Sequence, residues 1–454
     1  MAAKLISSRT RIADLGKPRI VIVGGGFGGL EVIKTLKGTN AQIVLFDKNN
    51  YHTFQPLLYQ VATSGLDTGS IVYPFRKVLG KNKDFYFRLG EVTHITPEQN
   101  TIETTIGSLK YDYLVIATGA NTNYYGMEDI QKYAVPIKTI EDAIQLRNKI
   151  IKNFENALLT DDNELMNSLM DYVVVGGGPT GVEIAGALAE LKKHVFPNDY
   201  KELDLYEMDV HLVEATPRLL NGMSDIAGKK AADFLTKMGV RLHLGQSVKS
   251  YDGHTVELND GTTIISRTLI WAAGVAGSPI PGLHEDAILR GNRIQVDEFN
   301  RVKGYDNIFA VGDVAAMITE DTPRGHPMMA PPAMQQGRHL ARNIKNIIQK
   351  RNLKPFKYLD KGSMATVGRN KAVVDMGKIR IQGFIAWFIW IFVHLLYLVG
   401  FRNKLGVLLT WISSYFSYDK SHRLIIGRSG TSEFEEILEI NSHIKPTKDE
   451  NQNS

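Results

Sequence analysis

The stretch Arg19-Ile-Val-Ile-Val-Gly24-Gly-Gly-Phe-Gly-Gly29 joins a short apolar run to a glycine-rich turn. The run is rich in β-branched residues, as a buried strand usually is. The turn has the spacing G-x-G-x-x-G, and a helical pattern follows it to about Lys37. In such a turn Gly24 permits the tight bend, Gly26 lets the backbone approach a pyrophosphate, and Gly29 lets helix and strand pack closely. The stretch predicts a strand–turn–helix unit that binds a dinucleotide.

A carboxylate follows where a ribose would bind. Asp47 ends the next apolar run, Gln42-Ile-Val-Leu-Phe46. An acidic residue about 20 positions after the first glycine hydrogen-bonds a ribose hydroxyl in dinucleotide-binding units. The order of strand, glycines, helix, strand and acid makes this first cradle a specific signal.

A second cradle repeats the arrangement later in the chain. Gly176-Gly-Gly178-Pro-Thr-Gly181 follows an apolar run, and Glu214 is the corresponding acid. Glu214 comes later than usual, so we expect an insertion with helical structure within residues 192–208. A carboxylate there binds the ribose of NADH and repels the 2′-phosphate of NADPH, although Arg218 nearby is a cation. NADH is the expected dinucleotide.

Other runs have the same composition and alternate with helical patterns. Continuous apolar strands separated by helices are typical of parallel sheets covered on both faces, so we expect an α/β fold with two Rossmann-like dinucleotide-binding domains. The runs are Tyr113-Leu-Val-Ile-Ala117, Asp171-Tyr-Val-Val-Val175, Thr268-Leu-Ile-Trp271 and Asn307-Ile-Phe-Ala-Val311.

The composition limits the chemistry. The chain has 454 residues, 43% hydrophobic and 22% charged, and a formal net charge of +5. This is a folded globular protein, and the mild charge does not favour nucleic acid as a partner. The chain has no cysteine, which excludes disulfides, thiolate-bound metal and redox dithiols. Redox chemistry would therefore need a cofactor, and the twelve histidines show no metal-ligand spacing.

The C-terminal part differs from the rest. The run from Gly383 to Phe401 carries no formal charge and is long enough for a transmembrane helix, and Leu405 to Tyr418 is amphipathic. Lys and Arg flank the first run, and its tryptophans suit the headgroup region of a bilayer. We expect monotopic attachment, with spanning and burial against the protein body as the alternatives. Beyond Lys445 we expect a disordered tail, and before Lys17 a loose tail without a secretory signal.

Several further motifs accompany the two cradles. They are Ala117-Thr118-Gly119, Trp271-Ala-Ala-Gly274, Phe309-Ala-Val-Gly312-Asp313, Tyr51-His-Thr-Phe-Gln-Pro-Leu-Leu-Tyr59, Gly178-Pro-Thr-Gly-Val-Glu183, Ala330-Pro-Pro-Ala-Met-Gln335 and Gly368-Arg-Asn-Lys371. With the cradles, these motifs resemble the two-dinucleotide-binding-domain flavoprotein superfamily. Within it the chain is most similar to type II NADH dehydrogenase, the non-proton-pumping NADH:quinone oxidoreductase.

The resemblance implies tightly bound FAD in the first cradle and NADH as co-substrate in the second. Hydride would pass from NADH to FAD, and two electrons would then pass to a membrane quinone, menaquinone or ubiquinone. It also implies an FAD-binding domain made of residues 18–135 and 291–350, an NADH-binding domain of residues 136–290 and a membrane-anchoring region of residues 351–454. A homodimer on the cytoplasmic face of the membrane is expected from the same source.

The site residues are carried over in the same way. For FAD they are Gly24, Gly25, Gly26, Phe27, Gly28, Gly29, Asp47, Lys48, Val92, Thr118, Gly119, Asp313, Ala333 and Met334. For NADH they are Gly176, Gly178, Gly181, Glu183, Glu214 and Gly274. Glu183 and Gln335 are the candidate catalytic residues, and Gln335 and Lys371 are the candidates for quinone binding.

One departure from the family affects the quinone site. The family commonly reads Ala-Gln-x-Ala-x-Gln, whereas Pro331 replaces the first glutamine here and Gln335 keeps the second. Two other functions stay open from the sequence: reduction of a soluble electron carrier, and redox sensing by a protein that binds FAD and NADH but turns over slowly.

Overall fold

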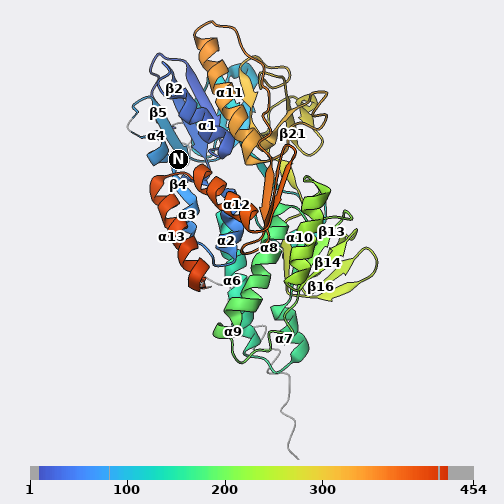
Figure 1. Cartoon of the computed structure of the whole chain (residues 1–454). Coiled ribbons are helices and arrows are strands. Elements are labelled where there is room, and N and C mark those ends of the chain that lie inside the picture. The colour runs from blue at the N-terminus through green and yellow to red at the C-terminus, as the bar shows by residue number, and fades with distance from the viewer. Residues whose placement is uncertain (1–9, 81, 418–419, 428–454) are drawn as a thin grey trace, which may run out of the picture. The chain divides into compact units, whose positions relative to one another are not determined.

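The computed structural model describes residues 10–80, 82–417 and 420–427, which excludes the tail expected beyond Lys445 and the first nine residues. The chain forms two compact units, drawn in Figure 1. Unit 1 consists of Met1–Phe54, Ile71–Asn123 and Gly274–Gly362. Unit 2 consists of Gln55–Ser70, Tyr124–Ala273 and Ser363–Ser454. Both units are thus discontinuous in the sequence.

Unit 1 is built on a five-stranded parallel sheet. The strand order is β22-β9-β1-β2-β5, so the first strand of the chain lies in the centre. These strands are β1 (Arg19–Val23), β2 (Gln42–Asp47), β5 (Phe85–Leu89), β9 (Tyr113–Ile116) and β22 (Ile308–Ala310).

Both faces of this sheet are buried. Ile20 and Ile22 belong to one hydrophobic cluster with residues of α1 (Phe27–Leu36) and α11 (Ala330–Ile348), whose helices lie side by side in Figure 1. Val21 and Val23 belong to a second cluster on the other face, with β6 (Val92–Thr96), β7 (Thr101–Thr104) and β8 (Gly107–Lys110). Burial on both faces explains why β1 is apolar throughout rather than alternating.

Unit 2 repeats the same plan. Its parallel sheet has the order β11-β18-β12-β13-β14, again with the strand before the glycine turn in the centre. These strands are β11 (Val135–Pro136), β12 (Tyr172–Val175), β13 (Val210–Glu214), β14 (Val240–Leu244) and β18 (Thr268–Trp271). The prediction of an α/β fold with two Rossmann-like units is therefore confirmed.

The predicted insertion before Glu214 is also confirmed. The helix that follows the second glycine turn, α8 (Pro179–Glu190), continues into a π-helical turn, Leu191–Val195, and then into α9 (Phe196–Asp199). A π-helical turn shifts the side-chain register of a helix and is frequent at functional sites. The first part of the extra chain thus lengthens the helix, and residues 200–209 then lead through turns to β13.

The C-terminal part of unit 2 combines a small sheet with two helices. The antiparallel sheet consists of β24 (Ser363–Thr366), β25 (Ala372–Met376) and β26 (Ile379–Gln382). The helices are α12 (Phe384–Tyr397) and α13 (Phe401–Ser417), which contact each other through Trp387 and Tyr415, with ring centroids 5.6 Å apart.

The apolar run from Gly383 to Phe401 does not form one helix. It breaks after Tyr397, and Gly400 has a φ of +89°. Among the described residues, no helix is both long and apolar enough to cross a membrane.

Candidate active site

The first cradle is held in shape by hydrogen bonds from its own backbone. The Gly24 N–H donates to the carbonyl of Phe46 at 2.8 Å, and the Gly25 N–H donates to Asp47 Oδ2 at 2.6 Å. Burial raises the pKa of Asp47, while the N–H groups of Gly25 and Asn49 oppose that rise. The acid predicted from the sequence therefore lies at the glycine turn.

Two glycines of this cradle have no room for a side chain, and a third faces open space. A Cβ at Gly24 would lie 2.4 Å from the carbonyl oxygen of Ala117, and Gly24 has a φ of +97°. A Cβ at Gly29 would lie 1.9 Å from the oxygen of Gly24. A Cβ at Gly26 would meet no atom within 4 Å, so this backbone faces open space at the N-terminus of α1. A pyrophosphate fits there, because free N–H groups and the helix dipole attract anions.

The remaining FAD candidates belong to unit 1 as well. Thr118 Oγ1 donates to the carbonyl of Ser278 at 2.5 Å, and the Ser278 N–H donates to the carbonyl of Gly119 at 3.1 Å. Ala333 is buried at the start of α11, and its oxygen lies 3.5 Å from the position of a Cβ on Gly28. The other predicted FAD-binding residues also lie in unit 1; they are Phe27, Lys48, Val92, Asp313 and Met334.

Two residues stabilise this cradle although the sequence did not single them out for that purpose. Gln336 is buried and its Oε1 accepts a hydrogen bond from the Gly312 N–H at 2.8 Å, which fixes the turn that carries Asp313. His52 is buried with Nδ1 2.9 Å from the carbonyl of Gly25, and burial lowers its pKa to about 4, so the ring is neutral. The helical spacing Ala333–Gln336–Leu340 is the signal that marks Gln336 as inward-facing.

The second cradle has the same hydrogen-bond pattern. The Gly176 N–H donates to the carbonyl of Val213 at 2.8 Å, and the Gly177 N–H donates to Glu214 Oε2 at 2.5 Å. A Cβ at Gly181 would lie 1.8 Å from the oxygen of Gly176, while one at Gly178 would meet no atom within 4 Å. The second cradle therefore fits a pyrophosphate and a ribose as the first does. Gly274, the remaining NADH candidate, has a φ of +96° and is grouped with unit 1.

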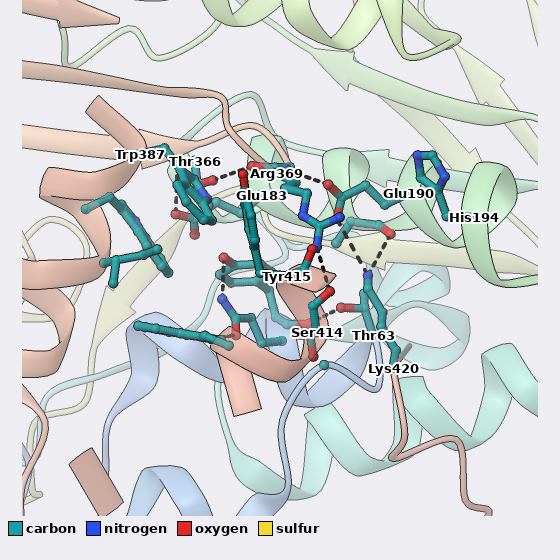
Figure 2. A pocket seen from close by; sticks show the side chains of 18 of the residues that line it. Thr63, Glu183, Glu190, His194, Thr366, Arg369, Trp387, Ser414, Tyr415 and Lys420 are labelled. Carbon is teal, nitrogen blue, oxygen red and sulfur yellow. Dashed lines mark hydrogen bonds and ion pairs between the residues drawn. The ribbon is translucent and has the colours of Figure 1, made fainter. Parts of the chain in front are cut away.

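Unit 2 contains a cavity of about 140 Å³, shown in Figure 2. Its walls come from the segment after Phe54, from α8 with its π-helical turn, and from the C-terminal sheet and helices. The aromatic lining residues are Tyr59, Trp387, Trp390, Trp411 and Tyr415. A cavity lined by these aromatic rings together with polar and charged side chains suits a flat organic ring that carries polar groups.

Glu183 lines this cavity. It lies two residues after Gly181, so the helix that begins at the second cradle carries it there. Its Oε1 lies 3.4 Å from the N–H of Thr366, which donates to it. Burial raises the pKa of Glu183 to about 8, and the Thr366 hydrogen bond opposes the rise. At neutral pH the carboxyl is therefore largely protonated and able to donate a proton.

The other end of the cavity is charged. Glu190 lies two helical turns after Glu183, accepts a hydrogen bond from the Arg369 N–H, and lies 3.9 Å from Lys420 Nζ. The guanidinium of Arg369 donates to the carbonyls of Ser414, at 2.6 Å, and Tyr415. Figure 2 shows these side chains together. Arg369 thus satisfies carbonyls near the C-terminal end of α13, where a cation is favourable.

The two quinone candidates from the sequence are not among the lining residues of this cavity. Gln335 belongs to unit 1 and its amide forms two hydrogen bonds with the backbone of Leu359, at 2.9 and 3.0 Å. Lys371 ends the Gly368-Arg-Asn-Lys turn, and its carbonyl accepts from Val367 and Thr366. In that turn Gly368 and Arg369 line the cavity.

The tryptophans of the C-terminal helices point inward, and the prediction that they face a headgroup region is wrong for Trp390, which is 2% exposed. Trp411 Nε1 donates to Gln60 Oε1 at 2.7 Å, so the indole N–H is satisfied inside the protein. The outward faces carry aliphatic and phenylalanine side chains instead. These exposed residues are Phe384, Ile385, Phe388, Phe392 and Leu396 on α12 and Phe401, Leu405, Leu409, Ile412 and Phe416 on α13.

Comparison with known proteins identifies the family. The model of the pyridine nucleotide-disulphide oxidoreductases matches residues 18–337, and that of the NDH2 C-terminal domain matches residues 361–417. A type II NADH:quinone oxidoreductase of Mycobacterium tuberculosis is 40% identical over 414 residues, 88% of this chain and 88% of that protein. The chain belongs to the type II NADH:quinone oxidoreductase family.

Other members and structures agree with this assignment. The mitochondrial internal alternative NAD(P)H-ubiquinone oxidoreductase A1 of Solanum tuberosum is 30% identical over 434 residues, 88% of this chain and 86% of that protein. The structure of NDH2 from Plasmodium falciparum in complex with NADH shares the fold with a TM-score of 0.83, at 22% identity, over 90% of this chain and 100% of that one. The resemblance predicted from the motifs is confirmed, and with it the class of enzyme.

Proposed function

We propose that the chain is an FAD-dependent, non-proton-pumping NADH:quinone oxidoreductase that works at a membrane surface. One observation supports this most strongly: α8 begins at the second cradle and brings Glu183 into a cavity that is also lined by tryptophans of α12 and α13. The dinucleotide site and the candidate quinone cavity therefore share one helix within unit 2.

FAD fits the first cradle, which has an open backbone at Gly26 and a carboxylate at the turn. When bound, FAD supplies the carrier that accepts hydride from NADH and passes two electrons to the quinone. Asp47 would hold the adenosine ribose, and the α1 N-terminus the pyrophosphate. Asp313, held by the Gln336–Gly312 hydrogen bond, would bind the ribityl chain. Residues 18–135 and 291–350 would form this domain.

NADH would bind the second cradle, within a domain of residues 136–290. Gly176 and Gly181 permit the turn, Gly178 leaves room for the pyrophosphate, and Glu214 would hold the adenosine ribose. Gly274 would leave space for the nicotinamide end. Glu183 would position the carboxamide or deliver a proton towards the quinone, a role that a carboxyl with a pKa near 8 suits at neutral pH.

The quinone ring would occupy the aromatic cavity. Tyr59 and Gln60 line it, and the Gln60 amide donates to the Tyr59 hydroxyl at 2.9 Å, so this pair could hydrogen-bond a quinone carbonyl. Gln335 and Lys371 stay candidates on the family motif alone. Pro331 in place of the usual glutamine would change the preference among quinones.

The outward faces of α12 and α13 support monotopic attachment. Ten exposed apolar side chains lie along the two helices, and Arg402 and Lys404 at the start of α13 suit anionic headgroups. We place the protein on the cytoplasmic face of the membrane as a homodimer, with residues 351–454 as the anchoring region.

Anaerobic stopped-flow spectroscopy tests the proposal. We expect NADH to bleach the flavin absorbance of purified, lipid-supplemented protein rapidly, NADPH to bleach it slowly, and a lipophilic quinone to restore it. Bleaching that a quinone does not reverse would favour a soluble electron carrier or a sensor. Protein purified without flavin, and unable to bind added FAD, would contradict the cofactor assignment.

A further inference from the structure

The loop that follows Glu214 packs directly on the second cradle. The Leu220 N–H donates to the carbonyl of Gly177 at 2.8 Å, while the N–H of Gly177 donates to Glu214. Leu219 and Leu220 are buried, and Leu220 has a φ of +52°. Residues 215–222 are therefore fixed beside the carboxylate that would hold the adenosine ribose.

This loop carries one cation, Arg218, whose side chain is 32% exposed. Its Nε donates to Asn221 Oδ1 at 3.1 Å, and its Nη2 donates to the carbonyl of Asn221 at 2.9 Å. Its Nη1 forms an ion pair with Asp225, the first residue of α10 (Asp225–Lys237). The planar end of the guanidinium is thus turned towards Asn221 and Asp225.

The guanidinium of Arg218, in the loop after Glu214, could instead bind a phosphate on the adenosine ribose. NADPH differs from NADH by a phosphate on the adenosine ribose, and arginine binds phosphate through two parallel hydrogen bonds. Glu214 repels that phosphate, which is the usual basis for NADH preference. Arg218 would attract it, but only after leaving Asp225, whose own charge adds to the repulsion.

We propose that Asp225 is a specificity-determining residue, which keeps Arg218 in a resting position and thereby leaves a latent site for the 2′-phosphate of NADPH. This inference rests on the proposed binding of NADH to the second cradle. Because Asp225 is 80% exposed, its ion pair is weak, and one substitution would leave Arg218 held only by the neutral Asn221.

The test measures the binding of NAD⁺ and NADP⁺ to the oxidised holoenzyme by isothermal titration calorimetry. Glu214→Gln removes the direct repulsion and serves as the background. In that background we expect Asp225→Asn to strengthen NADP⁺ binding at least fivefold and to change NAD⁺ binding less than twofold. Adding Arg218→Gln should abolish the gain. Flavin content and thermal midpoint, measured for each variant, show that the fold is kept.

The outcomes distinguish a failure of Asp225 to restrain Arg218 from a failure of the second cradle to bind NADH. If NADP⁺ binding does not improve with Asp225→Asn, or if the gain survives Arg218→Gln, then Asp225 does not act by restraining Arg218 and the inference is overturned. If the unsubstituted enzyme fails to bind NAD⁺ at all, the assignment of the second cradle itself fails.

Discussion

Glu183 is a carboxyl group whose burial makes folding depend on pH. Its pKa is raised to about 8 in the folded protein, whereas glutamate in an unfolded chain titrates near pH 4.3. Between about pH 4.3 and 8 the folded protein holds the extra proton, so this group lowers the free energy of unfolding as pH rises, by at most about 1.4 kcal/mol per pH unit.

Glu183→Gln mimics the protonated carboxyl and should remove this slope. We expect urea denaturation of the variant to show a free energy of unfolding that falls less with pH than that of the unsubstituted protein. The difference should grow from about pH 5 to about pH 8. Parallel pH profiles for the two proteins would mean that Glu183 is already ionised at neutral pH.

Glu183→Ala tests the catalytic role instead. Because Glu183 would position the nicotinamide carboxamide or deliver a proton, we expect its loss to slow flavin reduction by NADH at least tenfold, on the order of 1.4 kcal/mol. The side chain contacts Thr366 but forms no part of the sheets. The thermal midpoint should change much less. Unchanged stopped-flow reduction in this variant would remove the assignment.

For single residues, the sequence predicted contacts within one strand–turn–helix unit and missed contacts between residues far apart in the chain. Asp47 and Glu214 lie at their cradles because strand, turn and acid follow one another along the chain. Arg369 and Lys420 meet Glu190 although 179 residues separate Arg369 from it. No spacing rule could join them. Nor could a motif reveal that the Gln335 amide bonds the backbone of Leu359.

The two glycine turns are elements that one methyl group can disrupt separately. A Cβ at Gly29 or Gly181 would lie within 2 Å of a carbonyl oxygen, 1.9 Å in the first cradle and 1.8 Å in the second. We expect Gly29→Ala to lose bound FAD, and Gly181→Ala to keep FAD but bind NAD⁺ at least tenfold more weakly. Flavin absorbance and calorimetry measure the two effects.

Gly406→Ala is the matched control, since a Cβ there meets no atom within 4 Å and the residue lies inside α13. It should keep both FAD and NAD⁺ binding. If Gly181→Ala also lost FAD, the two cradles would not be independent binding elements.

Elements were predictable where periodicity is simple. The central strands match the apolar runs, because burial on both faces leaves a continuous signal. The end of α12 at Tyr397 was not predicted, because the apolar run continues without a charge to Phe401. The burial of Trp390 was not predicted either, since hydrophobicity alone does not distinguish a face that packs on protein from one that packs on lipid.

At the scale of the whole molecule, the exposed stripe of α13 predicts membrane binding. Leu409, Ile412 and Phe416 are 57%, 47% and 78% exposed. Because each side chain is already partly covered, burying its exposed part in lipid would contribute about 1–2 kcal/mol. Replacing all three with serine should weaken binding to vesicles containing anionic lipid at least tenfold, as measured by co-sedimentation, while NADH-driven reduction of a water-soluble quinone continues.

Tyr206→Ser is the control, because Tyr206 is 91% exposed but belongs to neither helix. It should leave vesicle binding unchanged. Deleting the helices would be a poorer experiment, because α12 and α13 also wall the cavity. Equal vesicle binding by the triple variant and the unsubstituted protein would argue against attachment through α13.

The same two helices present tryptophan to the cavity and bare apolar side chains to the outside. A long-tailed substrate would then arrive from within the lipid, so its mole fraction in the bilayer governs saturation. Adding empty vesicles would slow turnover by surface dilution even though the amount of quinone per volume is constant. For apolar inhibitors too, the mole fraction in the bilayer would govern inhibition. Their apparent potency would therefore depend partly on how strongly they partition into the membrane.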